Sequence, residues 1–126
     1  MSKAVLSVVD NAMEALRINY EFAEWTSDLV YPYWVGEYME TPSVNEDGMQ
    51  ETTFLLTGFS RGAWLDLEND KEKLESYFGK VGGHTVIADN GSAVAVFYSG
   101  GNIVPTGNAE LKRIEVSLTV KEWSVK

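Results

Sequence analysis

The sequence contains no cysteine, and its 126 residues include only three prolines and one histidine. A chain without cysteine cannot form disulfides, thiolate metal sites or a cysteine nucleophile, and this composition suits a reducing cytosol. No apolar run approaches the roughly 18 residues that a membrane helix needs. The first residues are interrupted by Asp10, Asn11 and Glu14, so they lack the core of a signal peptide. We therefore expect a soluble protein that does not bind membranes.

Basic residues are also scarce, because 10 lysines and arginines stand against 19 acidic residues, which gives a net charge of −9. A phosphate backbone would be repelled, so we expect no direct binding of nucleic acid. No lysine or arginine occurs between Arg17 and Arg61, whereas basic residues outnumber acidic ones from Leu111 onward. The acidic stretch is either a solvated face or one half of a contact in which opposite ends of the chain meet between subunits.

Motifs that would indicate catalysis or cofactor binding are incomplete. His84 has no neighbouring histidine or carboxylate at a ligand spacing. The acids between Asp66 and Glu72 lack the glycine and the terminal glutamate of a calcium loop. Residues 58–62 spell Gly-Phe-Ser-Arg-Gly, but the chain is too short for the fold that uses this pattern around a nucleophile. We therefore expect no enzyme activity, no metal and no cofactor.

Hydrophobic periodicity predicts a helix over residues 3–18, which Ser2 can cap. A second helix is predicted over residues 70–78, with a capping box formed by Asn69 and Glu72 and an end at Gly79. Residues 20–31 are expected to be an ordered connection. Between the helices, residues 33–40 and 51–61 are predicted to form a long hairpin around a mobile loop at 41–50.

Three further strands are predicted in the second half of the chain. Residues 84–88 and 93–99 form a hairpin around the turn at 89–91, and residues 100–108 form a glycine-rich loop. The last strand has the clearest alternation, and its buried face comprises Ile114, Val116, Leu118 and Val120. The chain is therefore predicted to be one α+β domain over residues 1–126, with a mainly antiparallel sheet of about five strands and two helices packed on one face.

Aromatic residues gather around Trp34 and again near the C-terminus at Trp123. They are typical of a small core, but tyrosine and tryptophan are also enriched in interface hot spots. A head-to-tail contact would place the acidic region of one copy against the basic C-terminal strand of the next. The candidate interface residues are Trp34, Glu37, Glu40, Arg113, Lys121 and Trp123.

The layout of the chain resembles the tail terminator or tail-completion proteins of long-tailed bacteriophages. The resemblance rests on the N-terminal helix, the run Tyr-Pro-Tyr-Trp-Val-Gly-Glu-Tyr at residues 31–38 that leads into a long hairpin, the following helix, and the final alternating strand. It implies a subunit of a ring, commonly hexameric, that caps the tail tube and joins it to the head. It also implies tail-tube and head-completion proteins as partners, no cofactor, and a location in the host bacterial cytoplasm during assembly and then in the virion tail.

A second hypothesis belongs to another functional class. The aromatic residues around Trp34 and Trp64 could form a cage for a small ligand or effector, provided that they line one concave apolar pocket with convergent polar groups. An enzyme is the third hypothesis, and it would require a cluster of titratable groups with perturbed pKa values in a cleft.

Overall fold

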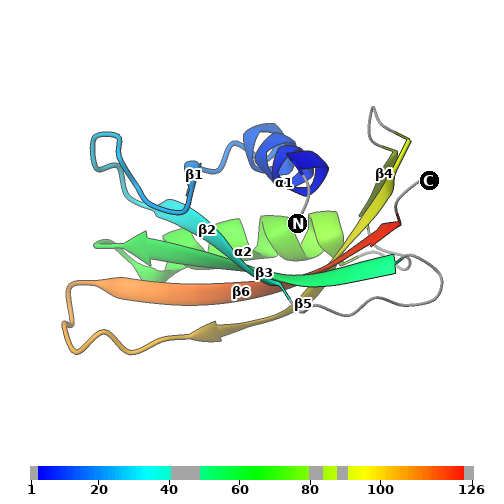
Figure 1. Cartoon of the computed structure of the whole chain (residues 1–126). Coiled ribbons are helices and arrows are strands. Elements are labelled where there is room, and N and C mark those ends of the chain that lie inside the picture. The colour runs from blue at the N-terminus through cyan, green and yellow to red at the C-terminus, as the bar shows by residue number, and fades with distance from the viewer. Residues whose placement is uncertain (1–2, 41–48, 80–83, 88–90, 124–126) are drawn as a thin grey trace.

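The computed structural model describes residues 3–40, 49–79, 84–87 and 91–123, which form two helices and one sheet (Figure 1). In chain order the elements are α1 (Lys3–Ala15), β1 (Tyr20–Phe22), β2 (Tyr33–Glu40), β3 (Met49–Ser60), α2 (Trp64–Phe78), β4 (His84–Ile87), β5 (Ala93–Ile103) and β6 (Lys112–Trp123).

The strands form a six-stranded sheet in the order β1-β2-β3-β6-β5-β4. β1 runs parallel to β2, and the other neighbouring pairs are antiparallel. The sheet is thus mixed, with one strand more than the predicted number, because β1 lies within the stretch predicted to be a connection. Besides the pairing along β1, backbone hydrogen bonds of 2.8 Å flank this strand at both ends, from Trp34 N–H to the Asn19 carbonyl and from Ala23 N–H to the Gly36 carbonyl.

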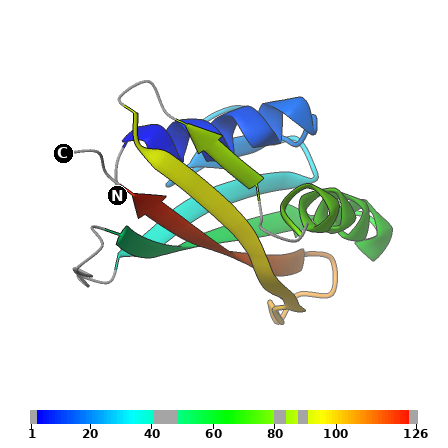
Figure 2. The same ribbon diagram turned by 90° about the vertical axis from the view of Figure 1, so that its right-hand side faces the viewer.

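Both helices pack on one face of the sheet, as the sequence predicts, and the sheet curls around them (Figure 2). We call this the inner face. One cluster of buried side chains joins Val5 and Val9 of α1, Leu74 of α2, and residues of β2, β3, β5 and β6 such as Phe54 and Val96. Burial of this continuous apolar surface is the main stabilising contribution to the fold.

The predicted face of the last strand is confirmed. Ile114, Val116, Leu118 and Val120 are at most 1% exposed and lie on the inner face of β6. β6 extends beyond the predicted run at both ends and pairs with β3 on one side and β5 on the other. The strand is therefore central in the sheet.

α1 ends at Ala15 rather than at the predicted residue 18. Arg17 adopts a left-handed conformation with φ of 58°, and its N–H donates to the Glu14 carbonyl at 3.0 Å. Ile18 N–H donates to the Met13 carbonyl at 3.0 Å, and the Ile18 side chain is buried. These paired bonds form a Schellman cap, in which arginine occupies the position that glycine usually takes.

The predicted start of the second helix is wrong. α2 begins at Trp64 after Ala63, whose side chain makes no capping hydrogen bond, so Asn69 lies inside the helix instead of capping it. Burial of Leu67 against the sheet extends the helix toward its N-terminus. The predicted end is confirmed, because Gly79 is the C-terminal cap and its N–H donates to the Glu75 carbonyl.

β5 continues to Ile103, through residues that the sequence predicts as loop. A bulge between Tyr98 and Gly100 lets the strand pass the glycines and stay paired with β6. The predicted Ser2 cap, most of the loop at 41–50 and most of the turn at 89–91 lie outside the described residues. The last two residues of the predicted loop, 49 and 50, belong to β3 instead.

Candidate protein-interaction surface

The face of the sheet opposite the helices, which we call the outer face, carries several of the predicted interface residues. On β6 the odd-numbered residues alternate with the buried ones, so Arg113, Lys121 and Trp123 lie on the outer face. Glu37 of β2 lies on the same face, because it is opposite Leu55, which is opposite Ser117 of β6. The register therefore brings residues far apart in the sequence onto one surface.

Trp34 does not belong to this surface, so its prediction as an interface anchor is wrong. Its side chain is fully buried in the core, and its Nε1–H donates to Asp70 Oδ2 at 3.0 Å. The indole fills space left by Gly58, since a Cβ on that glycine would lie 2.6 Å from the ring. Glu40, another predicted interface residue, ends β2 opposite Thr52, and its side chain lies outside the described part.

A ladder of aromatic rings crosses one end of the outer face. Tyr33 stacks on Phe59 at 5.1 Å between centroids and also contacts Trp25 at 5.0 Å and Tyr31 at 5.6 Å. The Arg113 guanidinium lies over Phe59, 5.7 Å from the centroid. Burial raises the pKa of Tyr33, so its hydroxyl stays neutral beside these rings at ordinary pH.

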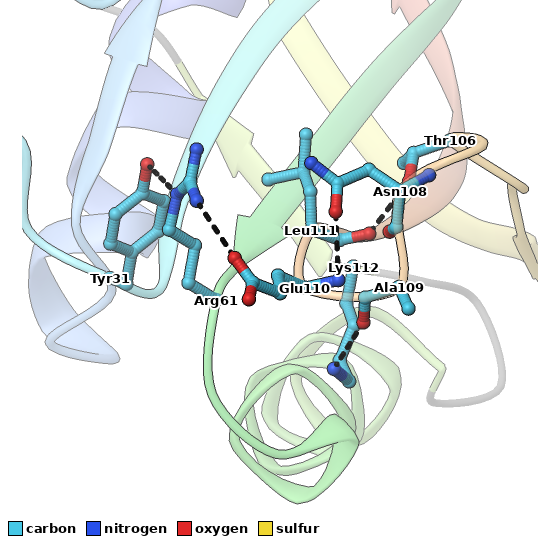
Figure 3. A network of polar contacts seen from close by, with 8 residues as sticks. All are labelled: Tyr31, Arg61, Thr106, Asn108, Ala109, Glu110, Leu111 and Lys112. Atoms are coloured by element: carbon cyan, nitrogen blue, oxygen red, sulfur yellow. Dashed lines mark hydrogen bonds and ion pairs between the residues drawn. The ribbon is translucent and has the colours of Figure 1, made fainter.

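Arg61 continues the ladder around the end of the sheet. Its Nε–H donates to the Tyr31 hydroxyl at 3.2 Å, and its guanidinium lies 5.9 Å from the centre of that ring. Its Nη1 is 3.9 Å from Glu110 Oε2, and both side chains are largely exposed (Figure 3). Water screens such an exposed ion pair, so it contributes little to stability.

The segment between β5 and β6 is braced by its own polar groups. Thr106 Oγ1 donates to the Leu111 carbonyl at 2.8 Å, and Glu110 N–H donates to Asn108 Oδ1 at 2.9 Å. Lys112 Nζ donates to the Ala109 carbonyl at 3.2 Å (Figure 3). These bonds fix the positions from which Glu110 and Lys112 project.

Lys112 lies over the ring of Trp64, 5.9 Å from its centroid. We call Arg61, Lys112 and Arg113, together with the rings of Tyr31, Tyr33, Phe59 and Trp64, the cation–aromatic cluster. Tryptophan, tyrosine and arginine are the residue types that dominate interface hot spots. The sequence prediction included Arg113 but missed Arg61 and Lys112, although Arg61 is the first cation after the long acidic stretch.

The acidic and basic regions of the chain are neighbours in the fold. β3, which belongs to the acidic stretch, pairs with β6, and Glu51 lies directly opposite Lys121. Lys121 also lies over Phe97 at 5.6 Å, and Arg113 Nη2 donates to Glu115 Oε1 at 3.0 Å. The two cations predicted to face a second copy are thus partly balanced within their own chain.

The aromatic cage of the ligand-binding hypothesis requires both tryptophans to line one pocket. Trp64 lines an open pocket of about 340 Å³ together with residues such as Ile103, Pro105 and Leu111. Trp34 is enclosed in the core and does not line this pocket. The two tryptophans therefore do not form one cage.

The residues that the sequence analysis considered for catalysis or metal binding do not lie in catalytic or metal-binding surroundings. Ser60 does stand between a strand and a helix, but it is 1% exposed and its Oγ accepts a hydrogen bond from Gly62 N–H. His84 packs against Tyr77 and Phe78 at the far end of α2. The acids from Asp66 to Glu72 lie within α2, which rules out a calcium loop there. Among the described residues, no group of three or more histidines and carboxylates could hold a metal ion.

Comparison with known proteins leaves the chain without an assigned family. No protein-family model matches it, and no curated protein is significantly similar to it. Neither described helix has the length and apolar character needed to cross a membrane.

Proposed function

We propose that the chain is a structural subunit of a phage or prophage tail, which assembles into a ring that terminates the tail tube and joins it to the head. The observation that carries the proposal is the outer face of the sheet, against which no described helix packs. It carries the aromatic ladder and Arg113 at one end, Lys121 and Trp123 at the other end of β6, and Glu37 between them. The resemblance of the sequence layout to tail terminator proteins gives this surface its proposed context.

The chemistry of the outer face suits binding to another protein. Trp123 remains 36% exposed, and the aromatic ladder ends in cations that already lie over rings. Rigid aromatic side chains bury large areas at low entropic cost, while surrounding charges set orientation and the rate of association. In the proposed assembly, this surface binds the tail-tube or head-completion protein in the host cytoplasm and remains in the virion tail.

The test is to co-express the chain with the products of the genes beside its own and to examine the particles by electron microscopy. We expect rings, with hexamers as the resemblance implies, seated on the ends of tail tubes. Trp123→Ala should reduce attachment to the tubes while leaving the melting temperature within the range of neutral surface substitutions. Tubes that never carry the protein, at any protein concentration, would reject the proposal.

A further inference from the structure

Two edges of the sheet are only partly covered within the described part of the chain. β1 pairs with residues 34–36 of β2 and leaves the rest of that strand at the edge. On the opposite side, β4 pairs with residues 93–96 of β5, and no described strand pairs with the outward edge of residues 100–103. Such edges present unpaired main-chain donors and acceptors, which can add a strand from another chain.

The direction of the backbone groups at the β2 edge follows from the bonds to β1. Trp34 N–H donates toward β1, and the Gly36 carbonyl accepts from Ala23 on the same side. Main-chain groups alternate between the two sides of a strand, so those of Tyr38 and Glu40 also point away from β3. They form the hydrogen-bonding positions of the open β2 edge.

At the β5 edge, the direction of the backbone groups follows from the bonds to β6. Val104 N–H donates to the Arg113 carbonyl on β6 at 3.0 Å. The groups of Gly101 and Ile103 therefore point away from β6, toward the open edge. Each open edge thus has two residues, two positions apart in the sequence, whose main-chain groups are available for pairing.

The faces of the two edges agree as well. Tyr38 lies opposite the buried Phe54, while Ile103 and Gly101 lie opposite the buried Ile114 and Val116, so all three edge positions belong to the inner face. Residues directly opposite in an antiparallel pair project from the same face. A second copy placed beside the first in the same orientation therefore continues both faces of the sheet.

Strand direction fits this arrangement. β2, β3, β6 and β5 are successively antiparallel, so β5 runs opposite to β2. The β2 edge of a second copy in the same orientation therefore meets β5 as an antiparallel neighbour, which is the direction that every described pair except β1 with β2 already uses.

We propose that the open edge of β2 in one copy pairs with the open edge of β5 in the next, with Tyr38 opposite Ile103 and Glu40 opposite Gly101. The inference rests on the self-assembly in the proposed function and names the contact that forms the ring. A contact between two different edges is heterologous, so it continues from copy to copy and closes when the rotation permits.

Side chains at the edges favour this register. Tyr38 is 42% exposed and Ile103 is 57% exposed, and the pairing covers each with the other. Lys71 of α2 lies over Gly101, with its Cε 2.8 Å from the position that a Cβ there would take. The register therefore places position 40 of one copy beside Gly101 of the next, on the face where Lys71 lies.

Cysteine cross-linking tests the register directly, because the chain has no cysteine of its own. Protein with Tyr38→Cys is mixed with protein carrying Ile103→Cys at about 1 mM, where even a millimolar contact is about half occupied. Directly opposite residues in a hydrogen-bonded pair have Cα atoms about 5.5 Å apart, which suits a disulfide. Mild oxidation should give the mixed dimer. Met39→Cys with Ile87→Cys is the matched control. Both residues are exposed, but Ile87 of β4 lies outside the proposed contact, so the pairing does not bring it to Met39.

Each outcome decides the proposal. A mixed dimer well above the control supports it, and it should weaken with Lys71→Glu and recover when Glu40→Lys is placed in the partner protein. Dimers of Tyr38→Cys alone, dimers of Ile103→Cys alone, or no product above the control would overturn it. Attachment to tail tubes without the mixed dimer would reject the edge contact and keep the proposed function. The mixed dimer without attachment to tail tubes would keep the edge contact and reject the proposed function.

Discussion

Replacing Trp34 with phenylalanine tests whether this residue supports the core, as its burial indicates, or an interface, as the sequence suggests. The substitution removes the Nε1–H that donates to Asp70 Oδ2 at 3.0 Å and leaves a smaller ring in a fully buried site. A buried carboxylate left without its donor costs about 1–3 kcal/mol, and the lost ring volume adds to this. We expect a loss of about 2–4 kcal/mol in the free energy of unfolding, from a total of about 5–15 kcal/mol.

The penalty should depend on pH in a defined direction. Burial raises the pKa of Asp70, and the hydrogen bond from Trp34 lowers it, so Trp34→Phe raises this pKa further. A carboxyl whose pKa is higher in the folded than in the unfolded state binds its proton more tightly when folded. Unfolding free energy therefore rises as the pH falls from neutral through the folded-state pKa. The cost of Trp34→Phe should be largest at neutral pH and should shrink in acid.

Urea denaturation followed by circular dichroism at several pH values measures both effects. In protein that carries Asp70→Asn, the penalty of Trp34→Phe, measured against the Asp70→Asn single variant, should not depend on pH, because the amide does not titrate. Trp123→Phe is the matched control, and its exposed site predicts a change within about 0.5 kcal/mol. A Trp34→Phe variant as stable as this control, or with the same penalty at every pH, would refute the structural role assigned to Trp34.

Two further substitutions test the packing of the sheet. Val116→Asp places an unpaired charge at a fully buried position of the central strand and should cost several kcal/mol of unfolding free energy. Thermal denaturation should show loss of the folded state. An unchanged melting temperature would contradict the register of β6. Gly58→Ala sets a Cβ 2.6 Å from the Trp34 ring and should cost about 1–3 kcal/mol in urea denaturation, whereas a neutral result would mean that the ring can move.

How far the sequence predicts the fold differs between strands for a physical reason. On β6, apolar residues alternate strictly with polar ones, so one face is buried under any arrangement of neighbours. On β2, both faces are apolar, because Tyr33 and Val35 alternate with Trp34 and Tyr38. The bounds of β2 are predicted correctly at residues 33–40, but its pattern does not say which face enters the core.

The face of β2 is decided by residues distant in sequence. Asp70, 36 positions away from Trp34, supplies the buried acceptor for its indole, and Gly58 leaves room for the ring. β1 also escapes local prediction, since three residues become a strand only through bonds to the backbone of β2. The start of α2 likewise depends on burial of Leu67 against the sheet instead of on a capping pattern.

The sequence by itself determined the α+β composition, the central alternating strand, the end of α2 at Gly79 and the scarcity of cations between Arg17 and Arg61. These properties depend on local periodicity, glycine conformation and residue counts. Only the tertiary structure decided that Trp34 is internal and that Arg61 and Arg113 meet one aromatic ladder. It also decided that, among the described residues, the edges of β2 and β5 are only partly covered by β1 and β4. Those features depend on register and strand order, which arise from contacts between distant residues and leave no trace in a local pattern.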